Sequence, residues 1–140
     1  MREVTVTGGP NMGSVIKFEQ EYLYRGTNFN EFEEQIKKNN GFYCGCNDEY
    51  YGMGTFVALN IDGTVMYCSQ NKPLLLAVRH EQYKIDTPHS EEGWVIKGLI
   101  SLEDILLVTT EEILLKACPD FFSLSEKSQK YVKLKTGIMN

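Results

Sequence analysis

The sequence predicts an α+β fold for this chain of 140 residues. Short segments rich in branched and aromatic residues, which are typical of β-strands, recur through most of the chain. Only one early segment has the spacing of a long amphipathic helix, and the strand segments after it do not alternate strictly with helices. A doubly wound α/β sheet would show such alternation, so we expect about five or six strands and two or three helices in an α+β arrangement.

Strand structure is expected in the first part of the chain. The segment EVTVT, at residues 3–7, alternates apolar and polar residues, and it is compatible with a short strand, a tail or a loop. The segment SVIKFEQEYLYRGT, at residues 14–27, is rich in aromatic and branched residues and predicts a strand region. Within it, YLYR is the part with the strongest strand character.

The segment NFNEFEEQIKK, at residues 28–38, predicts a helix. Its apolar residues recur at three- and four-residue steps and form one face: Phe29, Phe32 and Ile36. Asn28 or Asn30 is expected to cap its beginning. Gly41 is expected to end it in a left-handed conformation.

The second half of the chain predicts further short elements. After the irregular stretch at residues 42–54, the expected strands are TFVALN, PLLLAVR, GWVIKGLI and ILLVTT. Residues 61–72 predict a turn with a short helix. Ser101 is a plausible cap for a one-turn helix at residues 102–104, and a helix is expected from residue 111 to Pro119.

The size and charge of the chain limit its organisation and its partners. We expect a single domain over residues 1–140, with a core at about 16–118 and a segment at 119–140 without an assigned role. The net charge of −5 argues against general binding to duplex nucleic acid. The sequence contains neither an apolar run long enough to span a bilayer nor a secretory signal. We therefore expect a cytoplasmic protein, or one exported by a route that needs no cleavable signal.

The four cysteines are expected to be free thiols, some of them buried as small apolar residues. They are Cys44, Cys46, Cys68 and Cys118. The single residue between Cys44 and Cys46 is too short a spacing for a common zinc site, and neither histidine lies at ligand spacing from a cysteine. We therefore expect no metal.

Three motifs follow one another in the chain. Arg25 and Gly26 come after the apolar run YLY, so that a planar guanidinium, suited to a phosphate or an amide, stands beside a residue without a side chain. The glycine-led strand GMGTFVALN covers Gly52 to Asn60. The pair Glu91 and Glu92 precedes the strand GWVIKGLI.

The order and spacing of these motifs resemble the ADP-ribosyltransferase fold, an NAD-using family of bacterial toxins, effectors and related enzymes. The resemblance covers about residues 22–110, and it implies a compact split β-sheet core with a few peripheral helices. It implies NAD as a substrate and a set of residues that bind it: Arg25, Gly26, Thr27, Gly54 and Phe56. It implies a catalytic set of Glu92, Glu91 and Arg25.

The resemblance also assigns roles within these sets. Arg25 would hold a phosphate or the nicotinamide-side ribose, the Gly26 backbone would pair with the nicotinamide carboxamide, and Phe56 would lie against the nicotinamide ring. Glu92 best matches the glutamate that binds the ribose and stabilises the positive charge of the departing sugar, which is of the oxocarbenium type. Glu91 stays open as an alternative, because the family often places one residue between its two glutamates. Removal of Arg25 is expected to weaken NAD binding with little effect on stability.

Other interpretations stay open beside this one. The chain would transfer ADP-ribose to an acceptor that the sequence does not name, whether a protein, a nucleic acid or a small molecule. A module on the same fold could instead bind a nucleotide or a protein without catalysis. An RNA 2′-phosphotransferase is a third use of the fold, although such an enzyme generally prefers a more basic surface.

Overall fold

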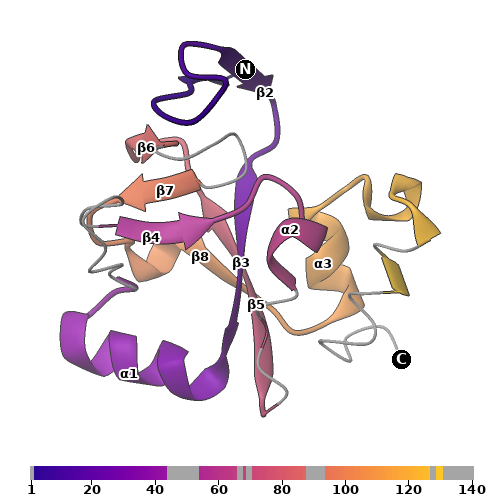
Figure 1. The fold of residues 1–140 in the computed structure, drawn as a ribbon. Coiled ribbons are helices and arrows are strands. Elements are labelled where there is room, and N and C mark those ends of the chain that lie inside the picture. The colour runs from indigo at the N-terminus through magenta and orange to yellow at the C-terminus, as the bar shows by residue number, and fades with distance from the viewer. Residues whose placement is uncertain are drawn as a thin grey trace.

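The computed structural model of the chain describes residues 2–43, 54–65, 68, 71–87, 94–126 and 129–130. Within these ranges the strands form three small antiparallel sheets (Figure 1). The strands are β1 (Arg2–Thr5), β2 (Val15–Phe18), β3 (Tyr22–Asn28), β4 (Gly54–Val57), β5 (Pro73–Arg79), β6 (Ile85–Asp86), β7 (Trp94–Lys97) and β8 (Ile105–Val108). The helices are α1 (Phe29–Asn39), α2 (Asp62–Val65) and α3 (Glu111–Ala117), with 3₁₀ turns η1 (Leu102–Asp104) and η2 (Phe121–Ser123). Helices beside antiparallel sheets agree with the α+β class that the sequence predicts.

More strands are present in the described ranges than the sequence predicts. The N-terminal segment forms a hairpin of its own from β1 and β2, which Figure 1 shows at one end of the molecule. The two-residue β6 pairs with β7 and has no periodicity of its own to reveal it. None of the helices in the described ranges has the length and apolar character that a membrane crossing requires.

The central sheet has the strand order β3-β5-β8. Its middle strand β5 pairs with both neighbours, and its residues Leu74 to Val78 are all buried. A strand covered on both faces needs apolar residues at successive positions, which explains the unbroken run LLLAV.

A second sheet, β4-β7-β6, lies against β3. An isolated bridge between Tyr24 and Ala58 joins the two sheets, with the N–H of each residue donating to the carbonyl of the other at 3.0 and 2.8 Å. The bridge places β4 alongside the outer edge of β3, the strand that carries Arg25. Figure 1 shows β4 and β7 on one side of β3 and helices α2 and α3 on the other.

Side chains of β3 and β5 alternate between two apolar clusters, one on each face of the central sheet. Leu23 and Leu76 belong to the first cluster, which also contains Trp94 of the second sheet. Tyr24 and Ala77 belong to the second cluster, which α3 covers. This second cluster extends past the expected end of the core at residue 118, because Phe121 of η2 is fully buried in it.

Helix α1 follows β3 directly and is capped at both ends. The Asn28 side chain accepts the N–H of Glu31 at 2.8 Å, so the first of the two expected caps is the one used. At the other end, Asn40 and not Gly41 takes the left-handed conformation, with φ of 51°. Gly41 has a different role, since a Cβ there would lie 2.8 Å from the Ile100 carbonyl oxygen.

The N-terminal hairpin is fastened to the turn after β5 through a buried histidine. The Arg2 guanidinium contacts His80 Nδ1 at 3.1 Å and donates to the carbonyls of His80 and Tyr83. Because arginine has no acceptor, His80 Nδ1 must accept, which leaves Nε2–H to donate to the Gln20 carbonyl at 2.7 Å. The contacts therefore select the neutral form of His80.

We expect stability to fall at acidic pH through His80. Burial lowers the pKa of His80 and Arg2 lowers it further, against the opposite effects of the Gln20 carbonyl, Glu81 and Glu21. A histidine with a lowered pKa in the folded state contributes stability that is present above about pH 6.5 and is lost as the pH falls through the folded value. Urea unfolding at several pH values below neutral should therefore show a steeper loss for the native protein than for His80→Gln. Equal pH dependence in the two proteins would contradict this role of His80.

Candidate functional site

Arg25 lies within β3, opposite Leu76 of β5, and its side chain is only 16% exposed. Nη1 donates to the carbonyl oxygen of Phe56 in β4 at 3.0 Å. Nη2 lies 3.2 Å from Oε1 of Glu31 in α1. The centre of the guanidinium lies 5.6 Å from the centroid of the Phe42 ring. The side chain thus joins β3 to β4, to α1 and to the segment after α1.

These contacts change the expected cost of losing Arg25. The sequence alone presents it as a ligand-binding residue whose removal leaves stability nearly unchanged. Among the described residues its hydrogen-bonded partners include the Phe56 carbonyl and the Glu31 carboxylate, which is only 33% exposed. Removing the guanidinium would leave that charge and a strand carbonyl without this donor, so a loss of stability is expected.

The backbone of Gly26 faces α2. Its N–H donates to Thr64 Oγ1 at 2.6 Å. A Cβ at this position would lie 2.2 Å from the Thr64 carbonyl oxygen and 3.1 Å from Cys68 Sγ. Glycine is therefore needed for the close approach of α2 to β3. A nicotinamide carboxamide that bound this N–H would have to replace the Thr64 hydroxyl.

Thr27 lies two residues beyond Arg25 on β3 and is 2% exposed. In the part of the chain that the structure describes, its Oγ1 has no hydrogen-bond partner. With so little exposed surface, the hydroxyl does not face an open ligand site. Among the residues expected to bind NAD, Thr27 is thus enclosed in the protein.

Gly54 and Phe56 both lie on β4, but the structure gives them different surroundings. A Cβ at Gly54 would lie 2.4 Å from Val95 Cγ1 and 2.5 Å from the Ile96 carbonyl oxygen, so the glycine allows β4 to pack closely on β7. Phe56 is half-buried, pairs with Val95 and offers its carbonyl to Arg25. Gly52, the other glycine of this motif, lies outside the described residues.

Glu91 and Glu92 also lie outside the described residues, as does His89. Trp94 is the first described residue after this gap and begins β7, where it pairs with Val57 at the end of β4. Ala58 follows Val57 directly and forms a bridge with Tyr24, the neighbour of Arg25 in β3. The strands that carry or follow the three sequence motifs, β3, β4 and β7, are therefore neighbours.

Three residues that define this site have no role predicted from the sequence: Glu31, Phe42 and Thr64. Glu31 resembles an ordinary acidic residue in the first turn of a helix, where negative charge suits the helix dipole. A signal for it exists, because an arginine inside an apolar strand needs a charged partner. Glu31, in the helix that follows Arg25, is the first glutamate after it in the sequence. No sequence signal identifies Phe42 or Thr64, since their contacts with β3 depend on the tertiary fold.

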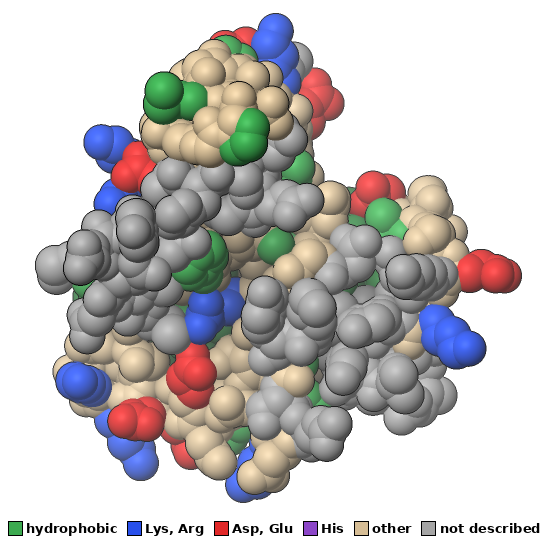
Figure 2. All heavy atoms as spheres, in the orientation of Figure 1, with side chains coloured by type: hydrophobic (Ala, Val, Ile, Leu, Met, Phe, Trp, Pro, Cys, Tyr) green, Lys and Arg blue, Asp and Glu red, His purple; other side chains and the backbone are tan. Residues whose placement is uncertain are grey.

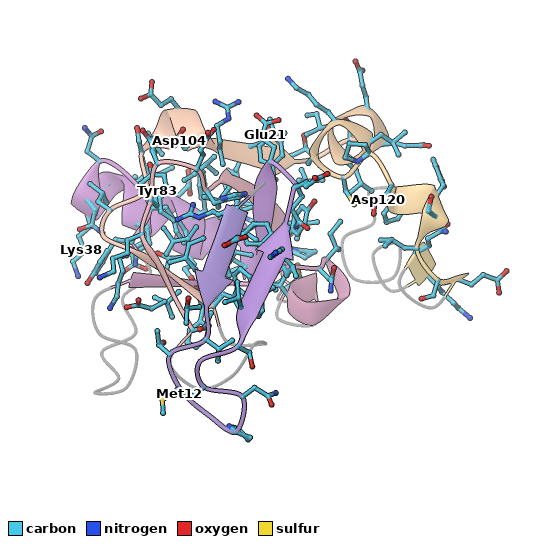
Figure 3. All side chains as sticks on the ribbon, turned by 90° about the horizontal axis from the view of Figure 1, so that it is seen from above. Met12, Glu21, Lys38, Tyr83, Asp104 and Asp120 are labelled. Atoms are coloured by element: carbon cyan, nitrogen blue, oxygen red, sulfur yellow. The ribbon has the colours of Figure 1, made fainter. Side chains whose placement is uncertain are left out.

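A separate pocket of about 570 Å³ lies on the other face of β3. The residues that line it include Glu21, just before β3, and Asp120, just after α3, both labelled in Figure 3. Tyr24 and Ala117 also line it, and the Tyr24 hydroxyl donates to the Ala117 carbonyl at 2.9 Å. Burial, and then the Asp120 carboxylate, raise the pKa of the Cys118 thiol to about 11. This thiol is therefore protonated at neutral pH and is not poised as a nucleophile.

The surface charge is mixed on the face drawn in Figure 2. Lysine and arginine side chains of the described residues are scattered there among acidic ones, without a continuous positive area. In the same described part of the chain, no group of three His, Cys, Asp or Glu side chains is arranged to hold a metal ion.

Comparison of the chain with protein-family models, with curated proteins and with solved structures gives no match.

Proposed function

We propose that the chain is an NAD-dependent ADP-ribosyltransferase, which cleaves the nicotinamide–ribose bond and transfers ADP-ribose to a protein, nucleic-acid or small-molecule acceptor. One observation carries the proposal: Arg25 of β3 donates to the Phe56 carbonyl of β4, the strand that pairs with β7. The resemblance expects the arginine, the aromatic and the glutamates to contribute to a single site. Such a site requires that β3 contacts β4. It also requires that β4 pairs with β7, the strand that follows Glu91 and Glu92 in the chain.

The chemistry needs few groups. As the bond between C1′ and the nicotinamide nitrogen breaks, its electron pair leaves with nicotinamide and the ribose becomes positively charged. A carboxylate, by the resemblance Glu92 with Glu91 as the alternative, stabilises this charge more in the transition state than in the ground state. An acceptor nucleophile then forms the new bond to C1′ and loses its proton. Arg25 would hold the pyrophosphate, and Phe56 would offer a ring against the cationic pyridinium.

A binding module without catalysis is the second candidate, and specific contacts favour it. The two terminal nitrogens of Arg25 already contact the Phe56 carbonyl and Glu31, and the Gly26 N–H already donates to Thr64. In a binding module, these groups would stabilise the fold, and the partner would bind to a different surface. An RNA 2′-phosphotransferase has no comparable support, because the net charge of −5 does not favour an RNA substrate.

Ligand binding and nicotinamide release separate these candidates. We expect NAD and ADP-ribose to raise the melting temperature of the protein, because a ligand that binds only the folded state stabilises it. We also expect the protein to release nicotinamide from NAD. Stabilisation without release would favour the binding module. Absence of both effects, with a panel of candidate acceptors present, would contradict the proposed enzyme.

Arg25 provides a mutational test of the site. Arg25→Ala and Arg25→Lys are both expected to weaken NAD binding at least tenfold, since the ammonium of lysine cannot donate two parallel hydrogen bonds to a phosphate. Arg25→Ala should also lower the free energy of unfolding by about 1–2 kcal/mol through the loss of its hydrogen bonds to Phe56 and Glu31. Titration calorimetry and urea unfolding measure the two effects.

Arg79 supplies a matched control for these variants. It too pairs with a glutamate, Glu21 at 3.0 Å, and lies near an aromatic ring, Tyr22 at 5.9 Å, but its side chain is 46% exposed. Arg79→Ala is therefore expected to leave NAD affinity unchanged. If Arg25→Lys binds NAD as well as the native protein does, the proposed bidentate hydrogen bonding of the guanidinium to a phosphate is wrong.

A further inference from the structure

We propose that Glu31 is an internal counter-ion that competes with anionic ligands for Arg25 and thereby sets the affinity of the site for the pyrophosphate of NAD. Glu31 belongs to none of the roles that the resemblance assigns. The inference rests on the proposed function for its ligand, and on the contacts of Arg25 for its mechanism.

The terminal nitrogens of the Arg25 guanidinium contact residues of β4 and α1. Nη1 donates to the Phe56 carbonyl, and Nη2 contacts the Glu31 carboxylate. A phosphate bound to arginine through two parallel hydrogen bonds needs two N–H groups on one edge of the guanidinium. The Phe56 carbonyl is fixed within β4, whereas Glu31 contacts Arg25 through a side chain that can rotate. The bond at Nη2 is therefore the one that an incoming phosphate displaces or shares.

The Glu31 carboxylate is available to Arg25 because another side chain, that of Asn28, caps the start of α1. Glu31 occupies the first turn of α1, and its own N–H is satisfied by Asn28 Oδ1 at 2.8 Å. In a capping box the glutamate side chain would return to the backbone of the capping residue. Here its Oε1 contacts Arg25 instead, and the asparagine cap holds the helix end.

The contact between Arg25 and Glu31 is also an ion pair. The two side chains are 16% and 33% exposed, so water screens their attraction less than it would on an open surface. A carboxylate 3.2 Å from Nη2 offsets much of the positive potential that Arg25 presents to a second anion. Without Glu31, the guanidinium would keep its bond to the Phe56 carbonyl and its position over the Phe42 ring. Removal of the carboxylate should therefore raise the positive potential that Arg25 presents to a phosphate, without releasing Arg25 from its place.

The test compares Glu31→Gln with Glu34→Gln. Both changes remove one negative charge from α1, but Glu34 is exposed and lies three residues further along the helix. Calorimetric titration should show that Glu31→Gln binds NAD, ADP-ribose and inorganic pyrophosphate about fivefold more tightly than the native protein, the effect of one partly screened ion pair. The gain should shrink as salt is raised from roughly 50 mM toward 1 M. Glu34→Gln should bind all three like the native protein.

If Glu31 has a purely structural role, Glu31→Gln should not gain affinity for anions. In that case a folded Glu31→Gln would bind the three anions equally well or more weakly, and its melting temperature would fall; this result overturns the inference. Glu31→Asp is a second test variant. Its shorter side chain keeps the negative charge but places the carboxylate further from Arg25 Nη2. It should show an intermediate gain in affinity, and native-like or weaker binding would again count against competition.

Pyrophosphate separates failure of this inference from failure of the proposed function. Tighter pyrophosphate binding by Glu31→Gln, with no binding of NAD, supports the counter-ion and contradicts the proposed enzyme. NAD binding that Arg25→Lys abolishes but Glu31→Gln does not tighten overturns the counter-ion alone. If neither the native protein nor Glu31→Gln binds any of the three anions, both are wrong.

Discussion

Replacing Glu92 with glutamine is expected to slow nicotinamide release about a hundredfold to a thousandfold, the usual cost of losing one well-placed electrostatic group. The carboxylate contributes most as positive charge appears on the ribose, so turnover should fall far more than NAD affinity. Glutamine keeps the shape and one acceptor of glutamate, and folding should be preserved. Initial rates of nicotinamide release and calorimetric NAD binding, measured on the same preparation, separate the two quantities.

Glu91→Gln is the control for this prediction, because it removes the same charge one residue earlier. Successive side chains point to opposite sides of an extended segment, so if this segment is extended, one of the two glutamates faces the ribose and the other faces away. An inactive Glu91→Gln beside an active Glu92→Gln would transfer the catalytic role to Glu91. Full activity in both variants would remove this segment from the catalytic mechanism.

Local patterns in the sequence predict the elements whose residues determine their own structure. The apolar spacing of Phe29, Phe32 and Ile36 predicts α1, and the unbroken run from Leu74 to Val78 predicts β5. Both signals come from neighbouring residues and need no knowledge of the rest of the chain. The same holds for the one-turn η1 after Ser101.

Pairing between distant segments is not contained in such patterns. The bridge from Tyr24 to Ala58 joins residues far apart in the sequence, and it determines which part of β3 faces β4. The end of α1 shows the same limit on a smaller scale. Glycine adopts the left-handed conformation more easily than asparagine does. The backbone of Gly41, however, lies in close contact with Ile100, and Asn40 takes the left-handed conformation.

The candidate site was partly predictable for the same reason. The resemblance implies that Arg25 and Phe56 share a site, and the structure joins them through a hydrogen bond from Arg25 to the backbone carbonyl of Phe56. The resemblance also implies that the Gly26 N–H binds a ligand, and the structure gives that N–H to Thr64. Each difference involves a residue brought close by folding, whose identity no nearby motif specifies.

Gly26→Ala is expected to be among the most destabilising substitutions in the central sheet. The new Cβ would lie 2.2 Å from the Thr64 carbonyl oxygen, a backbone atom that cannot rotate away as a side chain can. Helix α2 must shift, and the hydrogen bond from the Gly26 N–H to Thr64 Oγ1 is lost or lengthened with it. We expect a loss of about 3 kcal/mol in the free energy of unfolding, which lowers the melting temperature by roughly 10 °C in a chain of this size.

Gly63→Ala is the matched control within α2 itself. Among the described residues, a Cβ there would meet the Ala58 Cβ alone, at 3.3 Å, and alanine is favoured over glycine in a helix by about 1 kcal/mol. That variant should be as stable as the native protein or slightly more stable, and an equal loss in both variants would contradict the close approach of α2 to Gly26. Below its melting temperature, Gly26→Ala also tests the carboxamide role. If nicotinamide binds through this N–H, the displaced α2 should weaken binding of NAD more than binding of ADP-ribose, which lacks the carboxamide.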